Sequence, residues 1–387
     1  MPIDSKRGRA LAAACIVLAG LGLLGAIFEL GLTEQSAATR DFIGYWAAGR
    51  QMVHGANPYD AEQVLRLEKA VGLGDLQIKI TPSPPIGLAL VLPLGFFGAK
   101  SGLVLWMLAE LACLSGALWI IWHLEGRPPS RLHLVGYLFA PALACFMAGQ
   151  IGIFLLLGLC LFLLWSETRP FLAGAALLPM TLKPHLFLPT ALVLVLWVVI
   201  QRKPQIFAGL AASMAASFAL VVAFDPQVWA QYLAMMHSNL MQDRFAPTLS
   251  AYFRWNLAPA AVWLEYLPTA LACLWAIAYF WTRRNRWDWM QSGLLVLLVS
   301  VLCAPYAWLT DEAVLLPAVL AGVYRARTTR RSLLPIAVFA AIALVELWAN
   351  LRITSWYYTW TTPAWLAWFL YATWGSPKST QVGQPSA

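Results

Sequence analysis

The sequence predicts an all-α, multi-pass membrane protein with about 12 transmembrane helices, and three observations support this fold class. The 387 residues are 60% hydrophobic. Only 11% are charged, compared with roughly 25% in an average soluble domain. The apolar residues form runs that are separated by short polar breaks, the pattern of consecutive membrane-spanning helices. No soluble domain of useful size is left once these runs are removed.

The first expected span is the apolar stretch from Leu11 to Leu32. It is longer than a signal-peptide core of roughly 7–15 residues, so we interpret it as an uncleaved anchor; cleavage after Ser36-Ala37-Ala38 is the alternative. Further spans are expected near residues 101–122, 134–148, 151–165, 170–182, 187–200, 205–224, 259–281, 289–309, 313–324, 333–349 and 363–374. Several are shorter than the roughly 20 residues that cross a bilayer upright, so their number is approximate.

The positive charges predict the orientation of the chain. With a cytoplasmic N-terminus, the Lys and Arg residues fall mainly in cytoplasmic breaks, as the positive-inside rule requires. This assignment holds only if residues 85–97 form a re-entrant or other non-crossing segment. We therefore expect one transmembrane domain over residues 1–376 of a cytoplasmic (inner or plasma) membrane protein, with a first extracytoplasmic loop at about residues 33–99. The polar tail at 377–387 and both termini would be cytoplasmic.

The first extracytoplasmic loop is expected to contain two juxtamembrane helices. Gly55 would end the first helix, and Asn57-Pro58 favours an extended or turn conformation. Asp60-Ala61-Glu62-Gln63 has the pattern of a capping box that opens a second helix, which would reach Val71. The loop also carries unusual positive charge, which indicates an anionic partner: Arg40, Arg50, Arg66, Lys69 and Lys79.

Composition argues against several other kinds of site. All six cysteines lie in apolar runs, with no CxxC pair and no Cys/His spacing suited to zinc. We therefore expect neither disulfides nor a metal cluster. Asp311 and Glu312 do not form an Asp-x-Asp pair and no other acidic pair is spaced for Mg²⁺ or Mn²⁺, so we expect no metal. The net charge of +8 reports topology in a membrane protein. Because no basic stripe with interleaved aromatics lies outside the loops, the expected partners include membrane lipids but no nucleic acid.

Several polar segments fall on the extracytoplasmic side of this topology, independently of the charges that set the orientation. They are Asp41, Gln150, Lys183-Pro184-His185, the loop at 225–255, and Thr310-Asp311-Glu312. Their convergence predicts one polar cavity that faces outward. Asp41 is the foremost candidate, because a carboxylate near the bilayer is costly to solvate and marks a functional site by default. The alternative is that Asp41 caps a juxtamembrane helix.

Five groups of residues, taken in order along the chain, allow a comparison with a known family. They are Asp41-Phe42-x-x-Tyr45-Trp46-x-Ala48-Gly49-Arg50 with Gly55-x-Asn57-Pro58-Tyr59-Asp60, then Pro82-Ser83-Pro84-Pro85, Gly149-Gln150-Ile151, Leu182-Lys183-Pro184-His185, and Ala304-Pro305-Tyr306-Ala307-Trp308 with Asp311. Together they resemble glycosyltransferase family 87, which are polyprenyl-phosphate-sugar-dependent enzymes of the GT-C superfamily. The resemblance covers roughly residues 10–350. It departs from the family at Tyr306, where His is common, and at Gly152, where Asn is common.

This resemblance implies a GT-C-like helical bundle and a glycosyl transfer. One sugar, mannose or another hexose or pentose, would pass from a polyprenyl-phosphate donor to a lipid-linked or cell-envelope glycan at the extracytoplasmic face. It implies inversion at the anomeric carbon in one displacement, without a cofactor. Asp41 would be the general base, and a cation would stabilise the departing phosphate.

Lys183 is the first candidate for the donor phosphate. It lies in an apolar stretch beside Pro184, which breaks the helix and frees polar backbone; the alternative is a lysine that extends to the membrane interface. Arg50 and Arg40 are second candidates, and they could instead meet lipid headgroups. The candidate substrate-binding residues are Tyr45, Gln150, His185, Tyr306, Asp311 and Glu312. Asp311 and Glu312 could instead form the solvated tip of a turn.

A transporter or flippase of a lipid-linked anionic substrate is the alternative function, and a non-catalytic subunit of an envelope complex is a third. Transporters typically show an internal repeat, broken helices in both halves and ionisable residues near the membrane midplane. No repeat is visible in this sequence, and its polar groups gather at one face. Both observations favour the enzyme.

Overall fold

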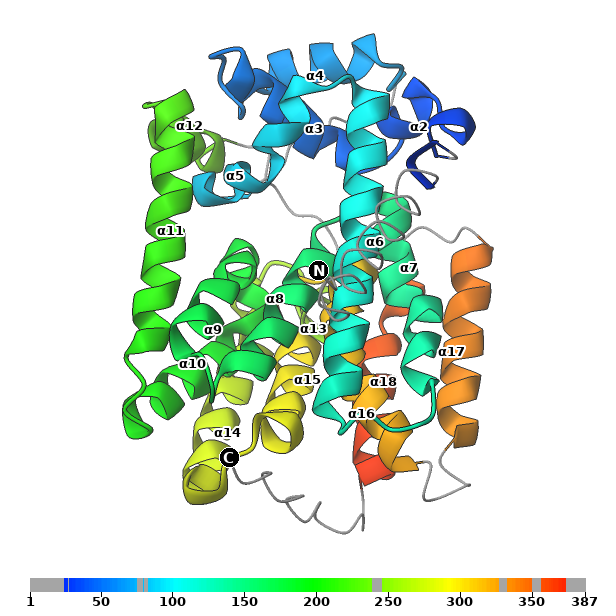
Figure 1. The fold of residues 1–387 in the computed structure, drawn as a ribbon, viewed down its shortest axis with the longest axis vertical. Coiled ribbons are helices and arrows are strands. Elements are labelled where there is room, and N and C mark those ends of the chain that lie inside the picture. Colours follow the sequence, from blue (N-terminus) through cyan, green and yellow to red (C-terminus); the bar gives the residue numbers. More distant parts are fainter. Residues whose placement is uncertain are drawn as a thin grey trace, which may run out of the picture. The chain divides into compact units, whose positions relative to one another are not determined.

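The computed structural model describes residues 24–26, 28–74, 79, 83–238, 246–326, 333–349 and 356–373 (Figure 1). Every regular element within these residues is helical, which confirms the predicted all-α class. The predictions for most of the N-terminal anchor, for residues 239–245 and for the tail at 377–387 lie outside the described residues.

The expected spans after residue 100 coincide with helices. The longer ones are α6 (Ala99–Leu124), α10 (Pro184–Ile200), α11 (Gln205–Phe224), α14 (Leu267–Arg283) and α17 (Leu333–Trp348). The shorter ones are α7 (Ala140–Ala148), α8 (Gly152–Trp165), α9 (Pro170–Ala176), α15 (Leu294–Leu302), α16 (Leu316–Ala326) and α18 (Thr361–Thr373). Short 3₁₀ or π-helical turns adjoin several of them: η3 (Leu132–Leu138), η4 (Leu178–Leu182), η6 (Val262–Glu265), η8 (Trp289–Gly293) and η9 (Leu309–Leu315).

Within the described residues, three helical stretches are long and apolar enough to cross a membrane: Ala99–Leu124, Gln205–Phe224 and Val262–Arg286. Within the same part of the chain, six further apolar helical stretches have 10–17 residues. At about 1.5 Å per residue they are shorter than a hydrocarbon core of about 30 Å. The expected number of about 12 spans is therefore not confirmed.

The segment at residues 85–97 belongs to this shorter group. It consists of η1 (Pro85–Gly87), α5 (Leu88–Val91) and η2 (Leu92–Phe96). Proline lies in the first turn of η1 and again of η2, where it interrupts a regular helix. Its length suits a non-crossing segment, which stays a prediction.

Chain contacts divide the protein into two compact units. The first comprises Met1–Gly116, Cys145–Lys183 and Gln205–Arg244, and the second comprises Ala117–Ala144, Pro184–Pro204 and Phe245–Ala387. In the first unit α9 and α11 pack closely, and glycine makes this possible. A Cβ on Gly174 would lie only 1.9 Å from the carbonyl oxygen of Ile206. In the second unit α18 contacts α16, and Trp365 and Trp368 are each 1% exposed. The single domain over residues 1–376 stays a prediction.

The two helices predicted in the first loop are α3 (Phe42–Val53) and α4 (Ala61–Ala70), which follow the short α2 (Glu34–Ala38). Gly55 turns the chain after α3 with a φ of 68°. Asp60 caps α4, accepting hydrogen bonds from the N–H groups of Glu62 and Gln63 at 3.0 and 3.1 Å. The predicted loop at 225–255 also carries helices, α12 (Val228–Met236) and α13 (Leu249–Leu257).

Candidate functional site

Asp41 precedes the first residue of α3 without capping that helix. Its backbone is helical, with φ −65° and ψ −22°, and its side chain makes no cap hydrogen bond. A capping aspartate has an extended backbone and accepts a bond from an N–H of the first turn. The capping alternative is therefore wrong, and the carboxylate binds other side chains instead.

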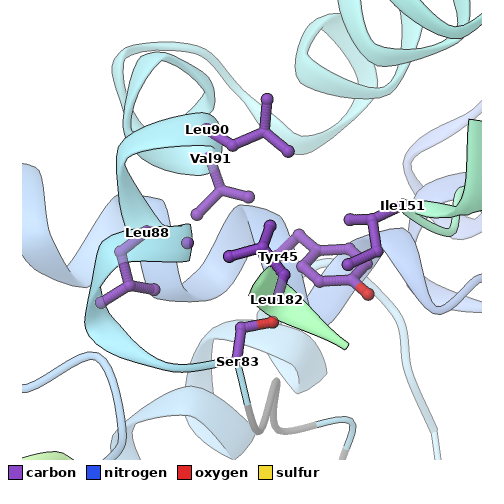
Figure 2. Close-up of a pocket in the computed structure, with 8 residues that line it drawn as sticks. Tyr45, Ser83, Leu88, Leu90, Val91, Ile151 and Leu182 are labelled. Carbon is purple, nitrogen blue, oxygen red and sulfur yellow. The ribbon is translucent and has the colours of Figure 1, made fainter. Parts of the chain in front are cut away.

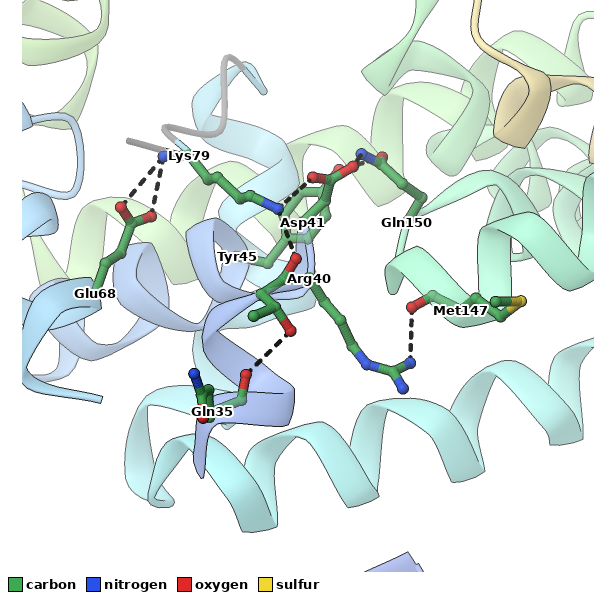
Figure 3. Close-up of polar contacts among 9 residues, drawn as sticks. Gln35, Arg40, Asp41, Tyr45, Glu68, Lys79, Met147 and Gln150 are labelled. Atoms are coloured by element: carbon green, nitrogen blue, oxygen red, sulfur yellow. Dashed lines mark hydrogen bonds and ion pairs between the residues drawn. The ribbon is translucent and has the colours of Figure 1, made fainter. Parts of the chain in front are cut away.

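The Asp41 carboxylate joins a hydrogen-bonded network with side chains that are distant in the sequence (Figure 3). Its Oδ1 accepts from Lys79 Nζ at 3.0 Å, and its Oδ2 accepts from Gln150 Nε2 at 2.9 Å. Gln150 Oε1 accepts from the Tyr45 hydroxyl at 2.9 Å. The structure thus brings together the predicted residues Asp41, Tyr45 and Gln150. We call them, with Lys79, the Asp41 network.

A glycine and a tryptophan position Gln150 against α3. Gly149 has a φ of 67°, in the left-handed region that favours glycine, and a Cβ there would lie 2.6 Å from the Cβ of Phe42. The Gly149 carbonyl accepts a hydrogen bond from Trp106 Nε1 at 3.1 Å. The Trp106 ring stacks on Tyr45, with ring centroids 5.6 Å apart. The Gly-Gln sequence is therefore needed for the network to form.

The Asp41 network is exposed to solvent at Asp41 and buried at Tyr45. The Asp41 side chain is 45% exposed and the Lys79 side chain is 25% exposed. Tyr45 is only 7% exposed. The carboxylate can therefore meet a ligand while buried groups hold its orientation.

Lys79 belongs to the network although its sequence position does not predict a site residue. It lies 38 residues from Asp41, in a segment without a recognisable motif. The only signal was the excess positive charge of the first loop, to which Lys79 contributes. The anionic partner that this charge indicated is, for Lys79, partly supplied by Asp41 itself.

Both predicted arginines of the first loop donate to backbone carbonyls. Arg40 Nη1 donates to Met147 O at 2.7 Å, and Arg50 Nη1 donates to Gly95 O at 2.9 Å. Beside Arg50, a Cβ on Gly49 would lie 2.4 Å from the carbonyl oxygen of Val91, so Gly49-Arg50 packs α3 on the segment before α6. Their contact with a donor phosphate stays a prediction.

A small apolar pocket lies beside Tyr45 (Figure 2). It is lined by Tyr45, Ser83, Gly87, Leu88, Leu90, Val91, Ile151 and Leu182. In this structure its side chains close on one another and leave no room for a water molecule. The pocket is therefore closed, and its aliphatic walls would suit hydrocarbon only if these side chains moved apart.

Lys183 follows the last residue of that pocket. Leu182 lines the pocket and ends η4, and α10 begins at Pro184, so the predicted helix break is present. Consecutive Cα atoms are about 3.8 Å apart, which places the Lys183 backbone next to the pocket wall. Its role in phosphate binding stays a prediction.

The remaining predicted residues belong to the second unit. The rings of His185 and Tyr306 meet edge to face, with centroids 5.4 Å apart. Trp308 Nε1 donates to the Tyr306 hydroxyl. The Asp311 Oδ2 accepts from the backbone N–H of Trp308 at 3.0 Å. The structure thus brings His185 and Tyr306 together, and gives Asp311 a local bond.

Glu312 is enclosed by protein. It is 3% exposed, and Asp311 is fully buried, so the alternative of a solvated turn tip is wrong. The Glu312 carboxylate accepts hydrogen bonds from the side chains of Thr361, Thr362 and Trp365. These bonds hold the Glu312 carboxylate within the protein, and its contact with substrate stays a prediction.

The described residues hold neither a metal cluster nor a disulfide. Within them, no group of three or more His, Cys, Asp and Glu side chains could hold a metal ion. Their cysteines form no disulfide. The predicted absence of a metal cofactor stays a prediction.

Apolar helices and a polar network built around an accessible carboxylate define a membrane protein with a candidate catalytic site. The model of glycosyltransferase family 87 matches residues 83–305, more than half of the chain, and the chain belongs to this family. The matched region includes Gln150, Lys183 and His185, whereas Asp41, Tyr306 and Glu312 lie outside it. No curated protein and no solved structure matches the chain. The protein is thus a membrane glycosyltransferase.

Proposed function

We propose that the protein transfers one sugar, mannose or another hexose or pentose, from a polyprenyl-phosphate donor. The acceptor is a lipid-linked or cell-envelope glycan at the extracytoplasmic face of the cytoplasmic membrane. Family membership supports the reaction class. We place the site at the Asp41 carboxylate because Lys79 and Gln150 hold it in position while its side chain is still 45% exposed. A general base that acts on an incoming hydroxyl needs both properties.

One displacement accounts for the transfer. Asp41 takes the proton of the acceptor hydroxyl while that oxygen forms a bond to the anomeric carbon. The bond between the anomeric carbon and the phosphate oxygen breaks, and its electron pair leaves with the polyprenyl phosphate. The attack comes from the side opposite the leaving group, so the anomeric carbon is inverted and no sugar–enzyme bond forms.

The leaving phosphate gains one negative charge, which positive groups must stabilise. Lys183 fits this need, because the preceding Leu182 lines the apolar pocket beside Tyr45. Aliphatic side chains next to a polar network also match a ligand in which a phosphate is joined to an isoprenoid chain, and these side chains would move apart to admit it. Arg40 and Arg50 are second candidates, and each already donates to a carbonyl.

Sugar transfer in proteoliposomes tests the proposal. The purified protein is given a panel of radiolabelled polyprenyl-phosphate sugars and an envelope lipid extract, with Asp41→Asn in parallel. We expect incorporation from one donor, and its loss in Asp41→Asn. If folded wild-type protein used none of these donors, the proposed donor class would be wrong, and flipping of the same lipids would then test the transporter.

A further inference from the structure

Lys79 is fixed by contacts at both ends of the residue (Figure 3). Its backbone N–H faces both carboxylate oxygens of Glu68, each at 3.2 Å. Its carbonyl packs on α3, where a Cβ on Gly44 would lie 1.8 Å away. Its Nζ donates to Thr39 O and to Asp41 Oδ1, both at 3.0 Å. The fold thus fixes the position of the Lys79 backbone and, in the unliganded protein, the position of its ammonium group.

Glu68 shows that this placement has a cost. The residue is fully buried, although it carries a carboxylate, and burial of a charge is unfavourable unless the charge is well bonded. Burial raises the pKa of Glu68 to about 7, while the hydrogen bond from Lys79 N–H and the Lys79 charge oppose that rise. An apolar side chain in place of Glu68 would leave the Lys79 N–H without this acceptor. The buried acid therefore serves the position of Lys79.

The ion pair conflicts with the proposed chemistry of Asp41. Lys79 Nζ donates to Asp41 Oδ1 and Gln150 Nε2 donates to Asp41 Oδ2, so both carboxylate oxygens are occupied and an acceptor hydroxyl must compete for one of them. The donor carries a phosphate that gains negative charge as it leaves, across the anomeric carbon from the hydroxyl on which the base acts. A lysine is a compact charge with several donors on a flexible stem, so one ammonium can serve either anion in turn.

We propose that Lys79 is a donor-binding residue whose ammonium pairs with Asp41 in the unliganded protein and moves to the phosphate of the polyprenyl-phosphate donor, which releases Asp41 to act as the base. This inference rests on the proposed function. Glu68 and Gly44 hold the Lys79 backbone, so the exchange needs only rotation of the lysine side chain. Donor binding and activation of the base then become one event, and the base stays paired until a donor is present.

Binding of a polyprenyl phosphate tests the exchange without requiring turnover. The probes are a polyprenyl phosphate and the uncharged polyprenol of the same length, titrated against detergent-solubilised wild type, Asp41→Asn, Lys79→Met and the double variant. Lys79→Met should weaken phosphate-lipid binding about tenfold or more, the effect of losing a charged hydrogen bond. Lys69→Met is the matched control, because Lys69 is an exposed lysine of the same loop, and its affinity should equal that of the wild type.

The double variant gives the decisive comparison. When Lys79 is present, Asp41→Asn should tighten binding of the phosphate lipid, because no ion pair between Lys79 and Asp41 has to break first. In the Lys79→Met background the same substitution should tighten binding less. Equal effects of Asp41→Asn in the two backgrounds would overturn the exchange. If Lys79→Met does not fold, Lys79→Arg replaces it. That variant keeps the charge without the compact ammonium, and it should retain most of the affinity; full loss of phosphate-lipid binding in folded Lys79→Arg would also overturn the exchange.

Failure of the proposed function gives a different result. Wild-type protein that binds the phosphate lipid no better than the polyprenol would contradict the donor class itself. Wild-type protein that prefers the phosphate lipid, with an equal preference in Lys79→Met, would contradict only the inference about Lys79.

Discussion

Asp41 and Glu312 are carboxylates that the sequence places in similar settings, each at the end of an apolar run, and the structure gives them opposite surroundings. Glu312 is 3% exposed, and its carboxylate oxygens accept bonds from side chains of helix α18. Asp41 has a side chain that is 45% exposed, and one of its partners is a lysine. A carboxylate whose hydrogen bonds all come from buried side chains of a helix stabilises the packing of that helix. One that shares its charge with a flexible cation can exchange partners.

The largest expected effect is that of Asp41→Asn on transfer. The substitution is nearly isosteric but removes the base, so kcat should fall by about 10²–10⁴-fold. The unfolding temperature should stay close to that of the wild type, because the Asp41 side chain is half-exposed and does not cap α3. Initial rates in proteoliposomes and thermal unfolding in detergent measure the two quantities. Retained activity would remove the proposed base.

Glu68 lies between these cases, since it is buried like Glu312 but binds the lysine of the Asp41 network. Its native pKa of about 7 lies above the ordinary 4.5, so between these pH values the native state holds a proton that the unfolded state lacks. Its contribution to stability is full below pH 4.5 and is lost as the pH rises through 7. Relative to Glu68→Gln, which does not titrate, wild type should lose up to roughly 3 kcal/mol between about pH 4.5 and 8.

Unfolding of wild type and Glu68→Gln across this pH range measures the effect. A stability difference that does not change with pH would mean that the native Glu68 keeps an ordinary pKa. Its burial would then carry no protonation cost.

Glu312→Ala should reduce stability instead of the intrinsic rate. It leaves the Thr362 hydroxyl and the Trp365 N–H without their acceptor, while the Thr361 hydroxyl keeps the Tyr358 carbonyl. Buried donors without partners cost about 1–3 kcal/mol. Chemical unfolding should show this loss, while transfer per folded molecule stays near the wild-type value. Unchanged stability with lost transfer would place Glu312 in the substrate site.

The smallest expected effect is that of Lys183→Ala, which should raise the donor KM about tenfold through the loss of a charged contact. The acceptor KM should change less, because the proposed partner is the donor phosphate. Steady-state rates with each substrate varied in turn separate the two. Equal changes in both values would argue against the phosphate role of Lys183.

The positions of the helices could be predicted because polar residues and prolines end the apolar runs sharply. The runs at 151–165 and 205–224 match α8 and α11 within one residue. The number of crossings could not be predicted, since α9, α15 and α16 adjoin 3₁₀ or π-helical turns that divide apolar runs into short pieces. Hydropathy alone does not reveal these divisions.

The candidate site could be predicted in part, at the residues that belong to short sequence motifs. Asp41, Tyr45 and Gln150 belong to recognisable motifs, and the structure joins them. Lys79 was not predictable, because its place depends on Glu68 and on the space left by Gly44. Such long-range complementarity has no period or motif in a single sequence.

The most direct test of the difference between the two carboxyl groups compares Asp41→Asn with Glu312→Gln, each a near-isosteric replacement of a carboxyl group by an amide. Both variants are reconstituted in parallel with the wild type, and each is scored for sugar transfer per folded molecule and for its unfolding temperature. We expect Asp41→Asn to lose transfer and keep its unfolding temperature, and Glu312→Gln to keep transfer and unfold at a lower temperature. An active Asp41→Asn, or a Glu312→Gln that loses transfer without losing stability, would contradict this assignment of chemistry and packing.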